Sequence, residues 1–329
     1  LVALYVNAGT LTTISTYSLP AAPLALTIAP NNAFLYVSTI GGIYVYSIAS
    51  TGKLILGNSA AAISSDPAQA MQVDATDSWL IEAVSGSAGV FAIPINPATG
   101  VPTSTTEQTR VLPASTIQQL TISPDNTYVF VAMGSGGTAA VPFTSANANP
   151  FGTVSTVAPV NSAGSALSVA VDPSDRLLYI GETAATAGSN SGGLRVFVFS
   201  TLTEVSGSPY ATSGLAPYSI LPEAGGTYVY VANRQINGSS SGVIAGYTVS
   251  ASNSTYSLSA LGSTFSAGTQ TVALAEDNTK NFIFAANNGG SPDLTGYVFD
   301  TTNAGYLDTV ISSSTGTDPV QASAIAAAH

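Results

Sequence analysis

Cysteine is absent from this chain, and positively charged residues are scarce. Without cysteine the protein can form neither a disulfide nor a thiolate metal site. Six Lys and Arg residues stand against 17 Asp and Glu residues, which gives a formal net charge of -11. Nucleic acids and anionic membranes bind basic patches, so we expect neither as a partner. We also expect no membrane span, because no apolar run reaches the roughly 18 residues that a span needs.

Histidine is almost absent as well, since the only one is His329. A Ser-His-Asp or Cys-His arrangement needs a positioned imidazole, and histidine-rich zinc or iron sites need several. The place of His329 at the end of the chain favours a structural role over a catalytic one. The sequence therefore predicts no catalytic residue, no metal site and no cofactor.

The surface that the sequence does provide is neutral and polar. Only 7% of the residues are charged, against roughly 25% in ordinary soluble domains. Ser, Thr, Asn, Gly and Ala take their place, as is common in secreted and cell-surface proteins, so we expect an extracytoplasmic location. The chain begins at Leu1 inside an apparent strand, which predicts a processed or trimmed start.

One unit recurs along the chain: an apolar strand, a tight polar turn, a second apolar strand, a Gly-rich loop and a third strand. Turn signals such as PNN, PDN, PSD and EDN separate alternating apolar runs, and helical periodicity is absent. Six complete units are visible, and the residues that anchor their second strands are 45, 49, 49, 51 and 54 positions apart. These anchors are Tyr36, Ile81, Phe130, Tyr179, Tyr230 and Phe284.

Units of about 40 to 50 residues with several strands each are typical of propeller blades. The termini supply a seventh unit, because residues 319–329 look like an innermost strand and residues 1–19 look like a second and a third strand. We therefore predict one all-β domain over residues 1–329, a seven-bladed β-propeller. Pairing of the C-terminal strand (320–328) beside the N-terminal strands (3–7) would close its ring.

Several residues that could suggest chemistry have structural explanations. Asp and Asn favour turns because their side chains bond nearby backbone N–H groups. The pairs of glycines in the Gly-rich loop between the second and third strands of the units precede no helix, so they do not indicate a phosphate-binding motif. The residues that we assign to the turn between first and second strands are Asn31, Asp125, Asp172, Asp175 and Asp277.

Two neighbouring units resemble a known family. The segments DPSDRLLYIGE (172–182) and YVYVANR (228–234) are similar to blades of the lactonase-type seven-bladed propellers, which include bacterial 6-phosphogluconolactonase and related YVTN-repeat surface proteins. The similarity covers nearly the whole chain as a repeat pattern, and such patterns specify fold better than function. The resemblance implies that Glu182 and Arg234 fill two roles of the catalytic members.

The chain departs from the catalytic pattern of that family. Glu182 lies three residues after Tyr179, whereas Arg234 lies four after Tyr230, and a one-residue offset in a strand reverses the facing side. The innermost strands begin GSALSV (164–169) and LAPYSI (215–220), without the family's Arg and His. Lactone hydrolysis needs a general base or activated water and cations for the acidic sugar. We therefore predict a non-catalytic member.

Two classes of function remain open. The favoured one is a non-catalytic propeller that binds a protein partner or assembles with copies of itself; the alternative is a lactonase-type hydrolase of a sugar lactone. Arg234 is either a ligand-binding residue or a loop cation paired with a carboxylate. An amide-rich rim of a central funnel suits a sugar or a peptide better than a phosphate. The candidate rim residues are Asn7, Glu182, Asn233, Arg234, Asn287 and Asn288.

The N-terminal unit also predicts an exposed strand edge. Tyr5 and Tyr36 are only 31 residues apart, so this unit lacks an outer strand and residues 11–19 should form its edge. Natural proteins blunt such edges with Lys, Pro or bulges, and an unprotected edge invites strand addition by another chain. Covering by coil or solvent is the alternative. The candidate docking residues are Thr12, Thr13, Ile14, Ser15, Thr16 and Tyr17.

Overall fold

The computed structural model describes residues 1–7, 10–87, 89–114, 116–185, 191–236, 239–253, 255–290, 292–313 and 322–328. The chain divides into two compact units, of which unit 1 is Leu1–Val157 with the end of the chain and unit 2 is Ala158–Ala327. The single-domain organisation therefore stays a prediction. The described residues include no helix that is long and apolar enough to cross a membrane.

Unit 1 is built of antiparallel strands and one 3-10 turn, η1 (Asn58–Ala60). Its strands are β1 (Val2–Asn7), β2 (Thr10–Thr16), β3 (Pro23–Ile28), β4 (Phe34–Thr39), β5 (Gly42–Ile48), β6 (Leu54–Leu56), β7 (Ala70–Val73), β8 (Trp79–Val84), β9 (Gly89–Pro94), β10 (Gln108–Val111), β11 (Gln119–Ile122), β12 (Tyr128–Ala132), β13 (Thr138–Pro142) and β14 (Ser155–Val157).

The regular elements among the described residues of unit 2 are all antiparallel strands. They are β15 (Ala166–Val171), β16 (Leu177–Glu182), β17 (Gly193–Val198), β18 (Thr203–Glu204), β19 (Tyr210–Ala211), β20 (Pro217–Pro222), β21 (Tyr228–Asn233), β22 (Ser241–Ser252), β23 (Thr255–Thr269), β24 (Thr271–Glu276), β25 (Phe282–Asn287), β26 (Leu294–Phe299) and β27 (Leu307–Ser313).

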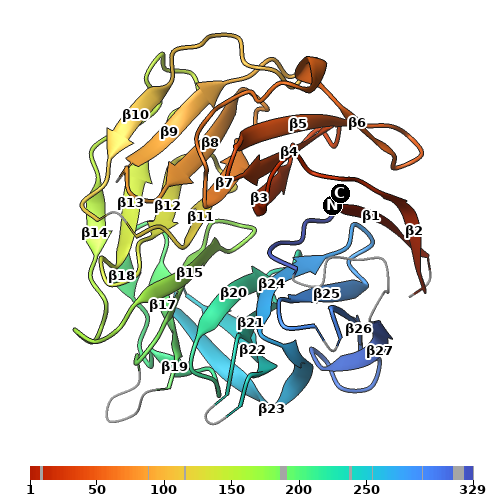
Figure 1. Ribbon diagram of the computed structural model, residues 1–329. Coiled ribbons are helices and arrows are strands. Elements are labelled where there is room, and N and C mark those ends of the chain that lie inside the picture. Colours follow the sequence, from red (N-terminus) through yellow and green to blue (C-terminus); the bar gives the residue numbers. More distant parts are fainter. Residues whose placement is uncertain are drawn as a thin grey trace. The chain divides into compact units, whose positions relative to one another are not determined.

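The strands form one sheet for each repeat unit seen in the sequence. Neighbours in the chain are neighbours in the sheet, as in β3-β4-β5-β6 and β24-β25-β26-β27, and β19 adds a fifth strand beside β17 (Figure 1). Among the described residues there are six such sheets of four or five strands. The residues that the structure describes thus form an all-β propeller with six blades.

The predicted seventh blade is wrong. In the described part of the chain β1 pairs with β2 alone, as a two-stranded sheet, and residues 322–328 form no strand. The predicted closure through residues 320–328 is therefore absent from these residues, while residues 319–321 and His329 lie outside them. Five of the seven residues 322–328 are Ala, which is depleted in strands and buries little apolar area.

The turns between first and second strands follow the predicted Asp and Asn chemistry. Asp172 accepts a hydrogen bond from the N–H of Ser174 at 2.9 Å, and Asp277 accepts one from the N–H of Phe282 at 2.9 Å. A left-handed residue follows in each of these turns, at Asp175 (φ 54°) and Lys280 (φ 60°). Their Asp side chains are therefore parts of turns.

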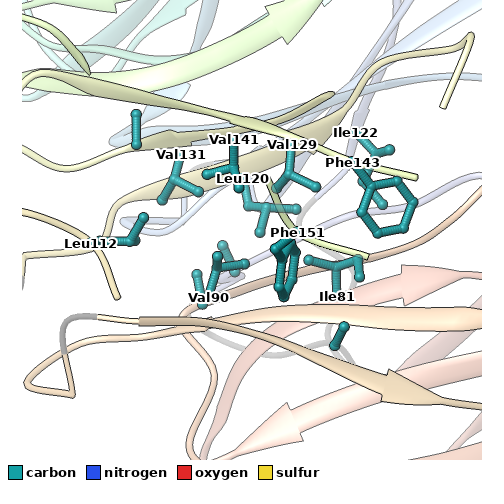
Figure 2. Packing of buried hydrophobic residues seen from close by; sticks show 14 of the residues in the cluster. Ile81, Val90, Leu112, Leu120, Ile122, Val129, Val131, Val141, Phe143 and Phe151 are labelled. Atoms are coloured by element: carbon teal, nitrogen blue, oxygen red, sulfur yellow. The ribbon is translucent and has the colours of Figure 1, made fainter. Parts of the chain in front are cut away.

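The core lies between the sheets. The six anchor residues of the second strands are all buried, with no more than 4% of any of them exposed. Figure 2 shows one layer in unit 1, where Ile81 and Val90 point from their sheet toward Val129, Val131 and Val141 of the next. Alternation along each strand sends successive side chains into two different layers, so neighbouring blades share their cores.

Candidate functional site

The second strands of unit 2 end at equivalent positions. Glu182 pairs with Ala166, Asn233 with Pro217, and Asn287 with Thr271, in each case at the start of the preceding strand. Glu182 is therefore the counterpart of Asn233, and Arg234 is one residue further on, as the spacing in the sequence indicated. All three strand-end side chains are completely buried.

The carboxylate of Glu182 is held by an arginine that the resemblance did not indicate. Arg195, on β17 and 6% exposed, donates from Nη1 to Glu182 Oε1 at 2.9 Å. Its other nitrogens bind Glu204 at 2.7 and 2.9 Å. The second oxygen of Glu182 accepts the N–H of Val160 at 3.0 Å. Both Glu182 oxygens thus accept hydrogen bonds from groups inside the protein.

The two buried asparagines tie loops to strands. Asn233 accepts a hydrogen bond from Thr212 Oγ1 and donates one to the Thr212 carbonyl, both at 2.8 Å. Asn287 accepts from Thr271 Oγ1 at 2.7 Å and donates to Thr295 Oγ1 at 3.1 Å. Each amide thus satisfies its polar atoms with threonine groups inside the fold, and neither side chain is exposed to solvent.

Arg234 is half-buried and bound only by neutral groups. Its Nη1 donates to the Tyr218 hydroxyl at 3.2 Å, and its Nη2 donates to Gln270 Oε1 at 2.9 Å. The guanidinium carbon lies 5.0 Å from the centre of the Tyr218 ring. Among the described residues the ion pairs involve Arg176 and Arg195 only. Among these residues no carboxylate partner for Arg234 is found, so no described carboxylate neutralises its positive charge.

A β-bulge places Tyr218 beside this arginine. The register of β20 shifts between Pro217 and Ser219, which leaves Tyr218 without a partner on β21. Such bulges re-aim a side chain and are frequent next to functional sites. The first strands β15 and β24 carry the same shift at Leu167 and Val272, so this position bears a polar side chain only in the blade of Tyr218 among these three.

Asn288 completes the group, because its backbone N–H binds the carbonyl of Gln270 at 2.9 Å. Its side chain donates to the Ala322 carbonyl at 3.1 Å. We call Tyr218, Arg234, Gln270 and Asn288 the Arg234 cluster. Asn7, the remaining candidate, is exposed at the end of β1 in unit 1, and nothing places it in the cluster. Tyr218 and Gln270 were not among the site residues that the sequence predicted, although the segment LAPYSI (215–220) contains Tyr218.

A group of side chains that could hold a cation lies in unit 1 rather than at this cluster. One carboxylate oxygen from each of Asp66, Glu82 and Glu107 lies within 4.8 Å of the other two.

The edge strand is also in unit 1. There β2 bears exposed Thr12, Thr13 and Thr16, while Ile14 and Ser15 are partly buried. Tyr17 follows the strand, and its hydroxyl accepts the N–H of Leu54 at 2.8 Å.

The β-propeller fold is similar to that of lactonase-like proteins of known structure. No model of a known protein family matches the sequence, and no curated protein matches it either. Among solved structures, a protein from Bacteroides uniformis named as a candidate 6-phosphogluconolactonase is similar, with a TM-score of 0.73 and 16% identity over 92% of this chain and 87% of that one. A periplasmic gluconolactonase from Pseudomonas aeruginosa gives a TM-score of 0.69 and 16% identity over 93% and 90%.

The same fold occurs in proteins of other kinds. The β-propeller domain of Cps50 (Swd1) from Myceliophteria thermophila gives a TM-score of 0.65 at 12% identity, over 95% of this chain and 92% of that domain. At such identities the similarity shows the fold alone, and function has to be argued from side chains.

Proposed function

We propose that this protein is a lactonase-type propeller that binds a sugar lactone, or the sugar acid formed from it, at the Arg234 cluster. The observation that carries the proposal is the guanidinium of Arg234, which is half-buried, held by Tyr218 and Gln270, and not paired with any carboxylate that the structure describes. A guanidinium in this state matches the carboxylate of a sugar acid or the carbonyl oxygen of a lactone. The amides of Gln270 and Asn288 and the Tyr218 hydroxyl suit sugar hydroxyl groups.

The names of the structural neighbours favour hydrolysis of a lactone, whereas the geometry of the side chains favours binding alone. A gluconolactonase and a candidate 6-phosphogluconolactonase among the neighbours favour hydrolysis of the lactone. Hydrolysis needs a base for the attacking water as well as a group that stabilises the oxyanion. Arg234 can stabilise the oxyanion, but Glu182 is bound by Arg195 and Val160. Binding is therefore the part of the function that the described side chains support.

The proposal includes an extracytoplasmic location. One structural neighbour is named as periplasmic, and the sparsely charged surface of this chain is of the kind found on exported proteins. Fractionation of the native organism, followed with an antibody against the chain, tests this part separately.

Replacing Arg234 by alanine should weaken the binding of gluconate at least about tenfold. A hydrogen bond to a charged group contributes about 1.5 to 3 kcal/mol, and about 1.4 kcal/mol is a factor of ten. Calorimetric titration with gluconate and with glucono-lactone measures the change, and a pH-stat assay follows lactone hydrolysis in the same samples. The control is Arg110→Ala, which removes a half-buried arginine of unit 1 that donates to the Phe151 carbonyl at 3.0 Å.

Unchanged gluconate affinity in Arg234→Ala, or an equal loss in Arg110→Ala, would contradict the proposed site. Lactone turnover that is present in the parent protein and lost in Arg234→Ala would establish the hydrolase alternative at the same site. Binding without turnover would establish the non-catalytic function.

The edge strand β2 supports a second function, self-association through strand addition. Among the described residues β2 has one neighbouring strand, β1, and its other edge is unpaired. Its exposed side chains are uncharged threonines. A register shift at Ile14 interrupts the pairing of β2 with β1, but no charged side chain or proline within β2 opposes pairing with a second copy of this chain.

Thr12→Lys combined with Thr16→Lys should convert associated protein to monomer, because both side chains are exposed and charges on an edge oppose strand pairing. Sedimentation velocity measures the association, and circular dichroism checks that the variant stays folded. Thr109→Lys, on an exposed position of β10, serves as the control and should associate like the parent. If the parent protein is monomeric at high concentration, the second function is wrong.

A further inference from the structure

Three carboxylates of unit 1 converge although they are far apart in the sequence. Asp66 lies in the segment before β7, Glu82 lies on β8, and Glu107 directly precedes β10. One oxygen of each is within 4.8 Å of the others. Like charges at this separation repel one another, so the arrangement requires an explanation.

The sheet register accounts for the meeting of the two glutamates. Thr109 of β10 lies opposite Phe91, and Phe91 lies opposite Glu82. Glu107 is two residues before Thr109, so it faces the same side of the sheet as Glu82. That side packs on the sheet of β3 to β6, because Leu80 and Ile93 share a core cluster with Tyr36.

Asp66 is positioned by the loop that leads into this sheet. Its N–H donates to Ser64 Oγ at 3.1 Å, and the Ser64 carbonyl accepts the N–H of Ile43 on β5 at 2.9 Å. The loop is thus fastened to one blade while Glu82 and Glu107 belong to the next. Ser38 lies opposite Ile43 on the sheet of β3 to β6, and its buried hydroxyl has no hydrogen-bond partner among the described residues.

Glu82 is the unusual member of the group. Its side chain is completely buried, and neither of its oxygens has a hydrogen-bond partner. A buried carboxyl group without a partner is costly unless a cation or hydrogen bonds compensate it. This carboxylate points into a cluster of two further carboxylates, so a cation is the fitting partner.

Protein cations do not supply the compensating charge. In the part of the chain that the structure describes, the ion pairs are made by Arg176 and Arg195, both in unit 2. Arg110 lies on β10 near Glu107, but it is paired opposite Val90, whose side chain packs in the core layer of the other face of the sheet. Its guanidinium donates to the Phe151 carbonyl there.

We propose that Asp66, Glu82 and Glu107 form a structural site for a hard divalent cation, with Ca²⁺ as the ion. Carboxylate oxygens are the ligands of hard cations. Opposite ligand oxygens around Ca²⁺ lie about 4.6 to 5.2 Å apart, since each is about 2.3 to 2.6 Å from the ion, so oxygens within 4.8 Å of one another fit around one ion. Ca²⁺ also accepts irregular geometry, whereas Mg²⁺ demands a near-ideal octahedron.

The bound ion would fasten the segment before β7 and the segment before β10 to the centre of the sheet. It would connect two blades in a chain that has no cysteine for a disulfide. A ligand that binds only the folded state raises its stability. This function is independent of sugar binding at the Arg234 cluster in unit 2.

Calcium should stabilise the chelator-treated protein, seen as a rise in its melting temperature with added CaCl₂ and reversed by EDTA. Terbium provides a direct probe, because Tb³⁺ occupies oxygen sites and its emission is excited through nearby indole. Trp79 is the sole tryptophan, and it lies three residues before Glu82 on the same strand, about 10 Å along it. Tb³⁺ emission excited through Trp79 should appear and be displaced by Ca²⁺.

Three variants test the ligands: Asp66→Asn, Glu82→Gln and Glu107→Gln. Loss of groups that merely orient metal ligands already costs about 10- to 100-fold in affinity, so each variant should lose at least about tenfold in Ca²⁺ affinity. Glu276→Gln is the matched control, because Glu276 is a buried glutamate of unit 2 with one unpaired oxygen; its Ca²⁺ affinity should equal that of the parent.

The outcomes separate cleanly. If Glu82→Gln fails to fold, the Ca²⁺ affinities of Asp66→Asn and Glu107→Gln still test the site, because these two side chains are partly exposed. An absence of any thermal or luminescence response to millimolar Ca²⁺ would overturn the proposal, as would a response that persists unchanged in the three variants. Tighter binding of Mg²⁺ than of Ca²⁺ would overturn the choice of ion.

Discussion

Replacing Arg195 by alanine should lower the free energy of unfolding by about 3 to 5 kcal/mol, the usual cost of removing one partner from a buried ion pair. Arg195 is 6% exposed and lies between Glu182 and Glu204. It also donates to the Ala158 carbonyl at 2.7 Å and lies over the Phe197 ring. Without it the carboxylate of Glu182 would be buried and would keep only the N–H of Val160. Denaturant unfolding followed by circular dichroism measures the loss.

The matched comparison is Arg234→Ala, which should cost only about 1 kcal/mol, since it removes hydrogen bonds to neutral groups and leaves no carboxylate behind. Equal losses in the two variants would contradict the role assigned to Arg195. Arg195→Ala combined with Glu182→Gln should recover part of the stability, because the uncompensated charge is then gone.

The effect of Arg195 should also depend on pH. Burial by itself raises the pKa of the Glu204 carboxyl, but the hydrogen bonds from Arg195 and Ser208 outweigh burial and lower that pKa below the usual value of 4.5. A carboxyl whose pKa is lowered in the folded state stabilises it above the unfolded pKa, and this contribution disappears as the pH falls through the folded value. The stability difference between the parent and Arg195→Ala should therefore shrink below about pH 4.

Phe130→Ala should lower the free energy of unfolding by a similar amount, about 3 to 5 kcal/mol, for a different reason. Phe130 is the anchor of β12, is fully buried, and stacks against Tyr128 with ring centres 5.5 Å apart. Its truncation removes apolar burial and leaves a cavity that close-packed blades fill only in part. Val111→Ala is the control, because Val111 is 72% exposed on an outer strand and should change the stability by less than about 0.5 kcal/mol. A small loss in Phe130→Ala would show that the anchor positions do not carry the core.

The blades were predictable because their signals are local. A strand that is buried on alternate faces shows its period of two within a few residues, and the Asp and Asn turns act on their own backbone neighbours. The six anchors, Tyr36 among them, were therefore found by position, and all are buried. The count of seven blades failed because the sequence pattern predicted a strand in residues 319–329, and the described part of that segment, residues 322–328, is Ala-rich and forms none.

The candidate site was predictable only in its motif residues. The strand ends drew attention to Glu182 and Arg234, and the spacing correctly showed that they occupy different positions of their strands. The sequence did not indicate which side chains contact Glu182 and Arg234. Arg195 lies 13 residues from Glu182, and Gln270 lies 36 residues from Arg234. Whether a strand-end side chain is occupied or available depends on these contacts.

The sequence by itself determined that this chain forms repeated, polar-surfaced β-blades and contains no cysteine and a single histidine. The tertiary structure alone decided which charges meet. Asp66, Glu82 and Glu107 are separated by 16 and 25 residues, and only the sheet register and the loop at Ser64 bring their oxygens together. One signal was present, a glutamate in the apolar run WLIEAV. Its partners Asp66 and Glu107 could not be predicted, because the whole fold determines which residues meet across strands and blades, and the local sequence does not specify it.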